Sequence, residues 1–192
     1  NLNLDWRKRV VFAAELAPGQ MNRFDCRLEI LPEKPRPQVK PRDGKIVFKN
    51  GELEVVINTA TGLMDRYRVG RKDYVREGAF EPLVIADNPD AWGMTVRSFR
   101  KVAGRFKLLS PKESARFSGV NGTALDAVRV IEDGPVRTVV EAVFGYKHSF
   151  LCQQYKLPKE GTEVEICTRV LWGEKDRMLK LSIPSALGAA RL

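Results

Sequence analysis

Histidine and cysteine are scarce in this sequence of 192 residues, which has one histidine and three cysteines. A single histidine cannot supply a histidine-rich zinc site from this chain alone. Cys26, Cys152 and Cys167 are odd in number, widely spaced and without a Cys-x-x-Cys pair, which predicts free thiols in a reducing compartment. We therefore expect a cytoplasmic protein whose fold depends on neither a metal nor a disulfide.

Long apolar runs and glycine-rich phosphate loops are also absent. No stretch approaches the roughly 20 apolar residues that a membrane-spanning helix requires, and the first residues lack the pattern of a signal peptide. The net charge is +9, but the basic residues are spread along the chain and accompany no nucleic-acid motif. We therefore expect no membrane partner, and a basic nucleic-acid-binding domain is the least favoured alternative.

Strand patterns dominate the chain. Apolar and polar residues alternate in residues 53–58, 162–170 and 178–183, which is the period of half-buried antiparallel strands. Turn pairs such as Asn50-Gly51 separate these runs, often at intervals of roughly eight to twelve residues. This pattern predicts an all-β fold, either an antiparallel β-sandwich or a barrel. The best candidate for a helix is the range Thr95–Val102.

Residues 32–43 have the sequence PEKPRPQVKPRD, and this density of proline predicts a linker. We expect the sandwich domain to occupy residues 44–192. Residues 1–31 contain two strand patterns, RVVFAAEL and RFDCRLEIL, joined by a turn at residues 17–20. Because two strands alone are marginal in water, we expect residues 1–31 to be the end of a small β-domain, with packing onto the main body as the alternative.

A candidate sugar-binding loop has the sequence ADNPDAWGM, residues 86–94. Aromatic rings stack on sugar faces, and carboxylates accept hydrogen bonds from sugar hydroxyls. Asp87, Asp90 and Trp92 are therefore the candidate substrate-binding residues. The favoured alternative is structural, with Trp92 filling an end of the sandwich and the aspartates forming Asx turns.

Two further clusters are predicted to be structural. In VIEDGPVR, Glu132 precedes a tight turn and can pair with Arg137. In VLWGEKDRMLKLSIP, Trp172, Glu174 and Lys175 lie on a connection between two strands, which an anchoring tryptophan and an ion pair would fix.

A nucleophilic site at His148 and Ser149, with Cys152 nearby, is not expected. A serine nucleophile needs a base within hydrogen-bond reach, and neighbouring residues on a strand point to opposite faces. No catalytic or metal-binding residue is therefore assigned in this chain.

Four strings occur in a fixed order along the chain: NGELEVVINTATG, DNPDAW, VIEDGPVR and WGEKDRMLKLSIP. In this order, over residues 45–184, they resemble the C-terminal β-sandwich region of class II α-mannosidases, glycoside hydrolase family 38. The resemblance implies a galactose-mutarotase-like supersandwich, incomplete in this chain. It also implies that residues 1–31 are similar to the end of the small β-domain that precedes the sandwich. Gly93 departs from the family pattern, in which an acidic residue often follows the tryptophan.

The resemblance also implies where the chemistry lies. Enzymes of this family cleave terminal α-linked mannose with retention. Their zinc ion, its ligands and the catalytic carboxylates belong to an N-terminal α/β domain that matches no part of this chain. We therefore expect the chain to hold no cofactor and to brace the catalytic domain of the parent protein, with zinc held there.

The expected substrates of that parent protein are α-mannosides or oligosaccharides, and this chain would help to frame their site. A stand-alone carbohydrate-binding module is the alternative. The open strand edges of an incomplete sandwich also make a homo-oligomer an expected partner.

Overall fold

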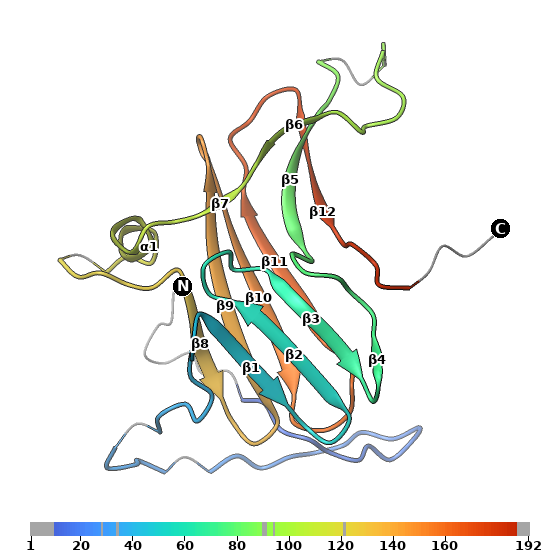
Figure 1. The fold of residues 1–192 in the computed structure, drawn as a ribbon. Helices are drawn as coiled ribbons and strands as arrows, with labels where there is room; N and C mark the ends of the chain where they lie inside the picture. The colour runs from blue at the N-terminus through green and yellow to red at the C-terminus, as the bar shows by residue number, and fades with distance from the viewer. Residues whose placement is uncertain are drawn as a thin grey trace.

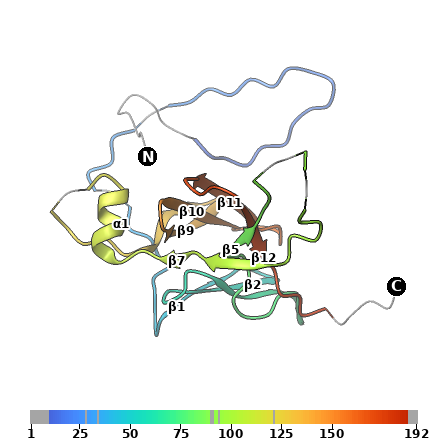
Figure 2. The same cartoon turned by 90° about the horizontal axis from the view of Figure 1, so that it is seen from above.

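A computed structural model describes residues 10–27, 29–33, 35–89, 92–93, 95–120 and 122–187. These residues form three antiparallel sheets and one short helix. Two of the sheets face each other as layers, and the third lies beside them (Figures 1 and 2). The prediction of an all-β antiparallel sandwich is therefore confirmed. Within these residues, no helix has the length and apolar character needed to cross a membrane.

The strands follow a simple order within each sheet. The first sheet has the order β1 (Lys45–Lys49), β2 (Leu53–Asn58), β3 (Met64–Val69) and β4 (Lys72–Asp73). The second has the order β11 (Glu165–Leu171), β10 (Ser149–Pro158), β9 (Arg137–Tyr146), with β7 (Lys107–Leu108) and β8 (Val128–Asp133) both paired to β9. The third has the order β12 (Arg177–Ser182), β5 (Glu81–Ala86) and β6 (Val102–Arg105).

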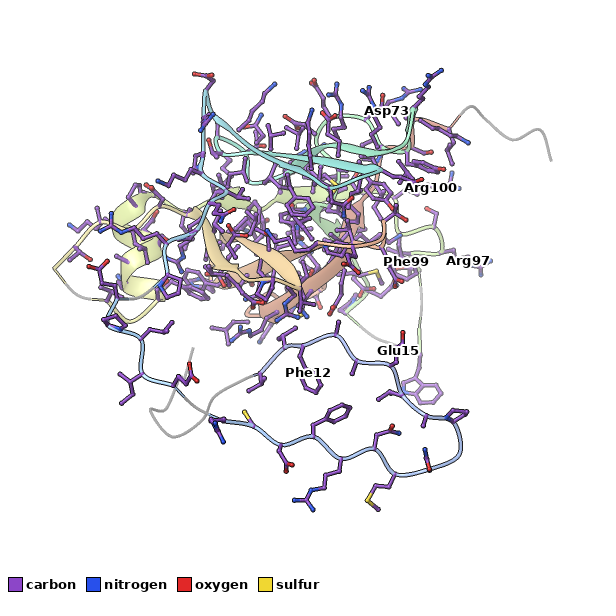
Figure 3. The ribbon with its side chains drawn as sticks, turned by 90° about the horizontal axis from the view of Figure 1, so that it is seen from below. Phe12, Glu15, Asp73, Arg97, Phe99 and Arg100 are labelled. Atoms are coloured by element: carbon purple, nitrogen blue, oxygen red, sulfur yellow. The ribbon has the colours of Figure 1, made fainter. Side chains whose placement is uncertain are left out.

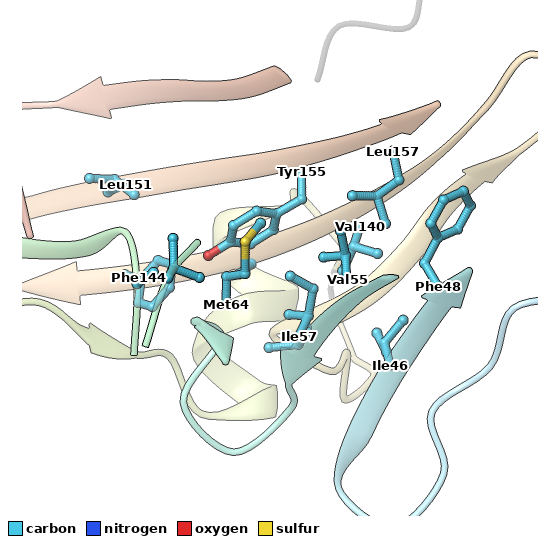
Figure 4. Close-up of a cluster of buried hydrophobic side chains, with 14 of the residues drawn as sticks. Ile46, Phe48, Val55, Ile57, Met64, Val140, Phe144, Leu151, Tyr155 and Leu157 are labelled. Atoms are coloured by element: carbon cyan, nitrogen blue, oxygen red, sulfur yellow. The ribbon is translucent and has the colours of Figure 1, made fainter. Parts of the chain in front are cut away.

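The apolar core lies between the first and second sheets. Val55 and Ile57 of β2 meet Val140 of β9 and Tyr155 of β10 in this layer (Figure 4). Side chains of a strand alternate between its two faces, so the predicted period of two in β2 delivers one apolar face to the core. Because full burial of such a side chain contributes roughly 1.5–3 kcal/mol, this layer dominates the stability of the fold.

A polar network crosses this core and joins the three sheets. The Tyr155 hydroxyl donates to the Gly62 carbonyl at 2.8 Å. The side-chain amide of Gln153 donates to the Tyr155 hydroxyl at 2.6 Å and to the Phe80 carbonyl at 3.2 Å. Gly62 lies in the β2–β3 turn of the first sheet, and Phe80 directly precedes β5 of the third.

The β1–β2 hairpin forms at the predicted Asn50-Gly51 pair, but neither residue has the positive φ that an Asn-Gly hairpin turn favours. The Asn50 side chain holds the hairpin instead, since its Oδ1 accepts from the Leu53 N–H at 3.1 Å. Its amide group donates to the carbonyls of Pro158 at 2.8 Å and Gly161 at 2.9 Å. Asn50 therefore ties a turn of the first sheet to the β10–β11 connection of the second.

The predicted helix at Thr95–Val102 is wrong, because the described residues in this range form no helix. The helix α1 lies later, at Pro111–Phe117. The Ser110 hydroxyl accepts from the Glu113 N–H, and the Glu113 carboxylate accepts from the Ser110 N–H at 2.9 Å. This capping box, with proline at the first helical position, is a start signal that can be read in the sequence.

The segment of residues 10–33 stands apart from the sandwich, on the side of the second sheet (Figures 2 and 3). Its described residues turn at residues 18–20, inside the predicted turn, but form no strand. Phe12 and Phe24 face each other with ring centroids 4.9 Å apart, so the chain doubles back as a hairpin would. The described parts of the two expected strands thus lie side by side without strand pairing. The domain boundaries remain a prediction.

Gly62 is expected to be intolerant of a side chain. Its φ is +72°, and an added Cβ would lie 2.9 Å from Leu108 Cδ2 and from Phe144 Cζ. We predict that Gly62→Ala lowers the free energy of unfolding by about 2–4 kcal/mol, because backbone strain adds to overpacking. The control is Gly161→Ala, where φ is +80° and no atom lies within 4 Å of the added Cβ. It should cost only about 1 kcal/mol. Equal losses in urea denaturation would contradict the packing argument.

Candidate functional site

The β5–β6 connection contains the three residues predicted to bind sugar. Trp92 is 97% exposed, so it does not fill an end of the sandwich. Asp87 directly follows β5, where its carboxylate accepts from the Asn88 N–H at 2.7 Å and its own N–H donates to the Asp176 carbonyl at 3.1 Å. Asp90 lies outside the described residues. The structure therefore places Asp87 at the foot of the loop, bonded to backbone, and Trp92 at the surface.

Asn88, which the sequence did not single out, shapes this loop. Its Oδ1 accepts from the Thr95 N–H at 2.8 Å, the Thr95 hydroxyl at 2.9 Å and the Val96 N–H at 2.7 Å. Its amide donates back to the Val96 carbonyl at 3.3 Å. One side chain thus closes the part of the loop that presents Trp92. The Asn-Pro pair at residues 88–89 was the available signal, since this pair favours turns.

Glu132 and Arg137 form a two-point ion pair across the β8–β9 turn. Arg137 Nε donates to Glu132 Oε1 at 2.8 Å, and Arg137 Nη2 donates to Glu132 Oε2 at 3.0 Å. These hydrogen bonds raise the pKa of Arg137 above its ordinary value. Both carboxylate oxygens are occupied by the pair, so this cluster holds a turn rather than a ligand.

Asp133, the next residue, is the strongest polar anchor of the described chain, with a side chain only 3% exposed. Its carboxylate accepts from Lys159 Nζ at 2.6 Å and the Thr138 hydroxyl at 2.7 Å, both in the second sheet or its connections. It also accepts from the Gln38 N–H at 2.7 Å and the Val39 N–H at 3.1 Å. Asp133 thereby fixes the proline-rich segment against the sandwich.

These contacts decide the ionisation of Asp133. Burial by itself would raise the pKa of the Asp133 carboxyl, but the hydrogen bonds from Lys159, Thr138, Val39 and Gln38 together outweigh it and hold the pKa well below its ordinary value. A carboxyl with a lowered pKa in the folded state stabilises the fold above its unfolded pKa of about 4, and that contribution is lost as the pH falls through the folded pKa.

We predict that Asp133→Asn lowers the free energy of unfolding at pH 7 by about 2–4 kcal/mol, because Lys159 loses its charged partner inside a largely buried network. The difference from the native chain should shrink as the pH is lowered below about 4. Urea denaturation at pH 7 and pH 3 measures both values. Asp126→Asn, at an exposed loop position, is the matched control and should change little. A pH-independent difference would contradict the role of the charge.

The connection before β12 is fixed by Trp172 and Glu174, but not by the expected ion pair with Lys175. Trp172 packs against the core, with its ring centroid 6.3 Å from that of Phe106. Glu174 Oε1 accepts from the His148 N–H at 3.1 Å. Lys175 is exposed, and within the described part of the chain no ion pair joins it to Glu174.

His148, Ser149 and Cys152 do not assemble a nucleophilic site. The buried Ser149 hydroxyl accepts from the Gly173 N–H at 2.9 Å and donates to Glu174 at 3.2 Å, so it is a structural link. Cys152 lies on the outer face of β10, where its thiol donates to Glu141 at 3.2 Å.

Glu141 forms the centre of a polar group on that outer face, although it is only 6% exposed. Its carboxylate accepts from Arg129 Nη2 at 2.7 Å and from Gln154 Nε2 at 3.0 Å. Burial raises the pKa of the Cys152 thiol to about 12, and the nearby Glu141 charge adds to the shift. Since the thiolate is the reactive form, Cys152 is an inert thiol.

We predict that Cys152 reacts with iodoacetamide at pH 8 at least about a hundredfold more slowly than the exposed Cys26 and Cys167, because burial suppresses both thiolate and access. Mass spectrometry of the alkylated peptides measures the three rates. In urea the three cysteines should react alike. Comparable rates in the native chain would contradict the assigned packing.

The described residues hold no group of three or more histidine, cysteine, aspartate or glutamate side chains that could bind a metal ion. The two largely buried carboxylates, of Asp133 and Glu141, are already bonded to protein donors. This part of the chain therefore does not fit a zinc site.

Comparison with known sequences assigns a family. The sequence model described as "Glycosyl hydrolases family 38 C-terminal domain" matches residues 48–192. A comparison with curated proteins finds none that matches the chain. The match begins within β1 and includes every later strand of the three sheets, so the sandwich, apart from the first residues of β1, is the matched unit.

Proposed function

This chain belongs to glycosyl hydrolases family 38, as a C-terminal domain, and we propose that it braces the catalytic domain of an α-mannosidase. It is a non-catalytic part of a glycosidase-family protein. The family membership implies a catalytic domain elsewhere in the parent chain. Bracing matters because catalytic groups must be held to within a fraction of an ångström by the structure around them.

The observation that carries the proposal is the apolar surface of residues 10–31. Ile30 is 100% exposed. The other exposed large apolar side chains of this segment are Val10, Phe12, Leu16, Met21, Phe24 and Leu31. Burial of apolar surface contributes roughly 25 cal/mol per Å², and a contiguous apolar patch left in water marks an interaction site. The catalytic domain of the parent chain is the partner that the family provides.

The second sheet adds a surface on the same side of the molecule. In the described part of the chain, β11 is one edge strand of this sheet, and Leu171 at its end is exposed. An edge strand presents unpaired N–H and carbonyl groups that a neighbouring segment can join. Figure 2 shows the segment of residues 10–31 lying over this sheet but apart from it. Both surfaces therefore suit one packed partner.

The β5–β6 loop supports a further part of the proposal, the framing of the sugar site. Trp92 is displayed at the surface by a loop that the Asn88 side chain closes. An exposed tryptophan ring can stack on the face of a sugar. We assign this loop to the rim of the substrate site, with mannosides as the expected substrates.

We predict that Ile30→Ser has opposite consequences in two settings. In the isolated chain it should leave the free energy of unfolding unchanged, because Ile30 is fully exposed there. In the parent protein it should cost about 1–3 kcal/mol, because the side chain is then buried against the catalytic domain. Thermal unfolding of both proteins, together with hydrolysis of an aryl α-mannoside by the parent, measures the effect.

The isolated chain is the matched control for the parent protein. An unchanged parent protein would contradict burial of this residue. Hydrolysis of the aryl α-mannoside by the isolated chain at the rate of the parent would contradict a non-catalytic role altogether.

A further inference from the structure

A groove of about 530 Å³ lies where the chain crosses from the third sheet to the second. β6 pairs with β5, and β7, two residues later, pairs with β9, so residues 102–108 bridge the two sheets. The lining residues that matter for its chemistry are Gly104, Arg105, Lys107, Gly145, Tyr146 and Lys147. This volume is in the range of small-molecule sites, roughly 300–1,000 Å³.

The lining contains three cations and no carboxylate. Arg105 is bound by Glu81, which lies outside the groove. Among the described residues, no carboxylate forms an ion pair with Lys107 or Lys147. The sequence around β6 and β7 adds none, since residues 91–112 contain no aspartate or glutamate. Two ammonium groups are therefore left uncompensated at one hollow.

The floor of the groove is built around the Tyr146 ring. A Cβ on Gly104 would lie 2.4 Å from Tyr146 Cε2, so glycine is the residue that lets this ring lie against the strand. Phe106 supports the ring from the core side, with centroids 5.7 Å apart. Lys147 Nζ lies 5.5 Å from the ring centroid, which holds one cation beside the aromatic surface.

We propose that this groove binds the anionic group of an acidic saccharide, either a phosphate or a carboxylate. Lys107 and Lys147 donate charge-assisted hydrogen bonds to the anionic oxygens. The half-buried Tyr146 ring offers an apolar surface to the sugar ring. The choice of a saccharide as carrier of the anion rests on the proposed function, whereas the anion site rests on the groove alone.

The cations of the lining favour an anion over a neutral sugar. Arg97 and Arg100 lie nearby in sequence, on the loop that leads into β6, and Figure 3 shows both near one end of the molecule. Positive charge in a hollow raises the local concentration of anionic ligands. The site is open to solvent, so binding should be weak, in roughly the millimolar range, and should weaken with added salt.

The test is a titration of the chain followed by the amide NMR signals of Gly104 and Gly145. The probes are mannose 6-phosphate, mannuronate, neutral mannose and inorganic phosphate. We expect saturable shifts with the two acidic sugars, at least about fivefold weaker binding of inorganic phosphate, and no saturation with mannose. The two acidic sugars together show whether phosphate or carboxylate is preferred.

Variants test the assigned residues. The double substitution Lys107→Gln and Lys147→Gln should weaken binding of the acidic sugars about tenfold or more, because both charged donors are removed. The matched control is the pair Lys45→Gln and Lys112→Gln, two exposed lysines outside the lining. It should leave binding unchanged.

Three outcomes would overturn the proposal. The first is no saturable shift with either acidic sugar at 20 mM, a concentration about twenty times the expected dissociation constant. The second is equal binding of mannose, and the third is retention of binding by the double variant. If inorganic phosphate bound as tightly as the phosphorylated sugar, the sugar would contribute nothing to binding, and a saccharide ligand would be excluded. None of these results bears on the contact between residues 10–31 and the catalytic domain, so the two proposals fail separately.

Discussion

The apolar layer between the first and second sheets is the interaction on which the rest of the structure depends. Each strand gives alternate side chains to this layer, so a shift of one residue in register would turn the apolar face of a strand to water. A polar group inside the layer must find its hydrogen-bond partner there, since an unpaired one is costly. The Tyr155 hydroxyl and the Gln153 side-chain N–H group meet this condition by bonding to each other and to the carbonyls of Gly62 and Phe80, whereas Gln153 Oε1 has no hydrogen-bond partner among the described residues. The same bonds fix how the three sheets sit against one another.

Outside this layer, carboxylate and amide side chains hold the connections together. Asn50, Asp133 and Glu174 each bond to the backbone of a segment distant in sequence. Connections contain backbone groups that no strand ladder satisfies, and leaving one buried and unpaired costs about 1–3 kcal/mol. A polar side chain at a strand end removes that cost. The polar atoms of these side chains already form hydrogen bonds within the protein. Clusters that resemble functional sites in the sequence are therefore structural in the fold.

The strands could be predicted because burial on one face leaves a period of two in the sequence, as in β2 and β11. The helix at residues 111–117 could not be found by periodicity, because seven residues are too few to show an apolar face, and its capping box was the only local signal. The pattern of residues 10–31 shows which side chains are apolar, but a strand also needs a neighbour to pair with. The role of Asp133 was beyond prediction, since one of its donors is 95 positions away. Trp92 was found by its residue type, whereas its exposure depends on how Asn88 folds the loop.

The positive surface follows from this use of carboxylates. Glu132 and Glu141 are bound by arginines of the same sheet, and each such pair neutralises a cation that is already part of the structure. With 33 basic and 24 acidic residues, cations outnumber the carboxylates that could pair with them. The surface cations are not evenly placed, because the groove beside Tyr146 holds Lys107 and Lys147 without a carboxylate in its lining.

Figure 1 shows that β6, which lines this groove, and the apolar segment of residues 10–31 lie at opposite ends of the molecule. The sandwich core is close-packed and resists deformation, so it fixes the position of the groove, while the apolar segment stands apart from it. In the bracing proposal the segment supplies the contact with the catalytic domain, and the rigid sandwich positions a ligand group at its other end.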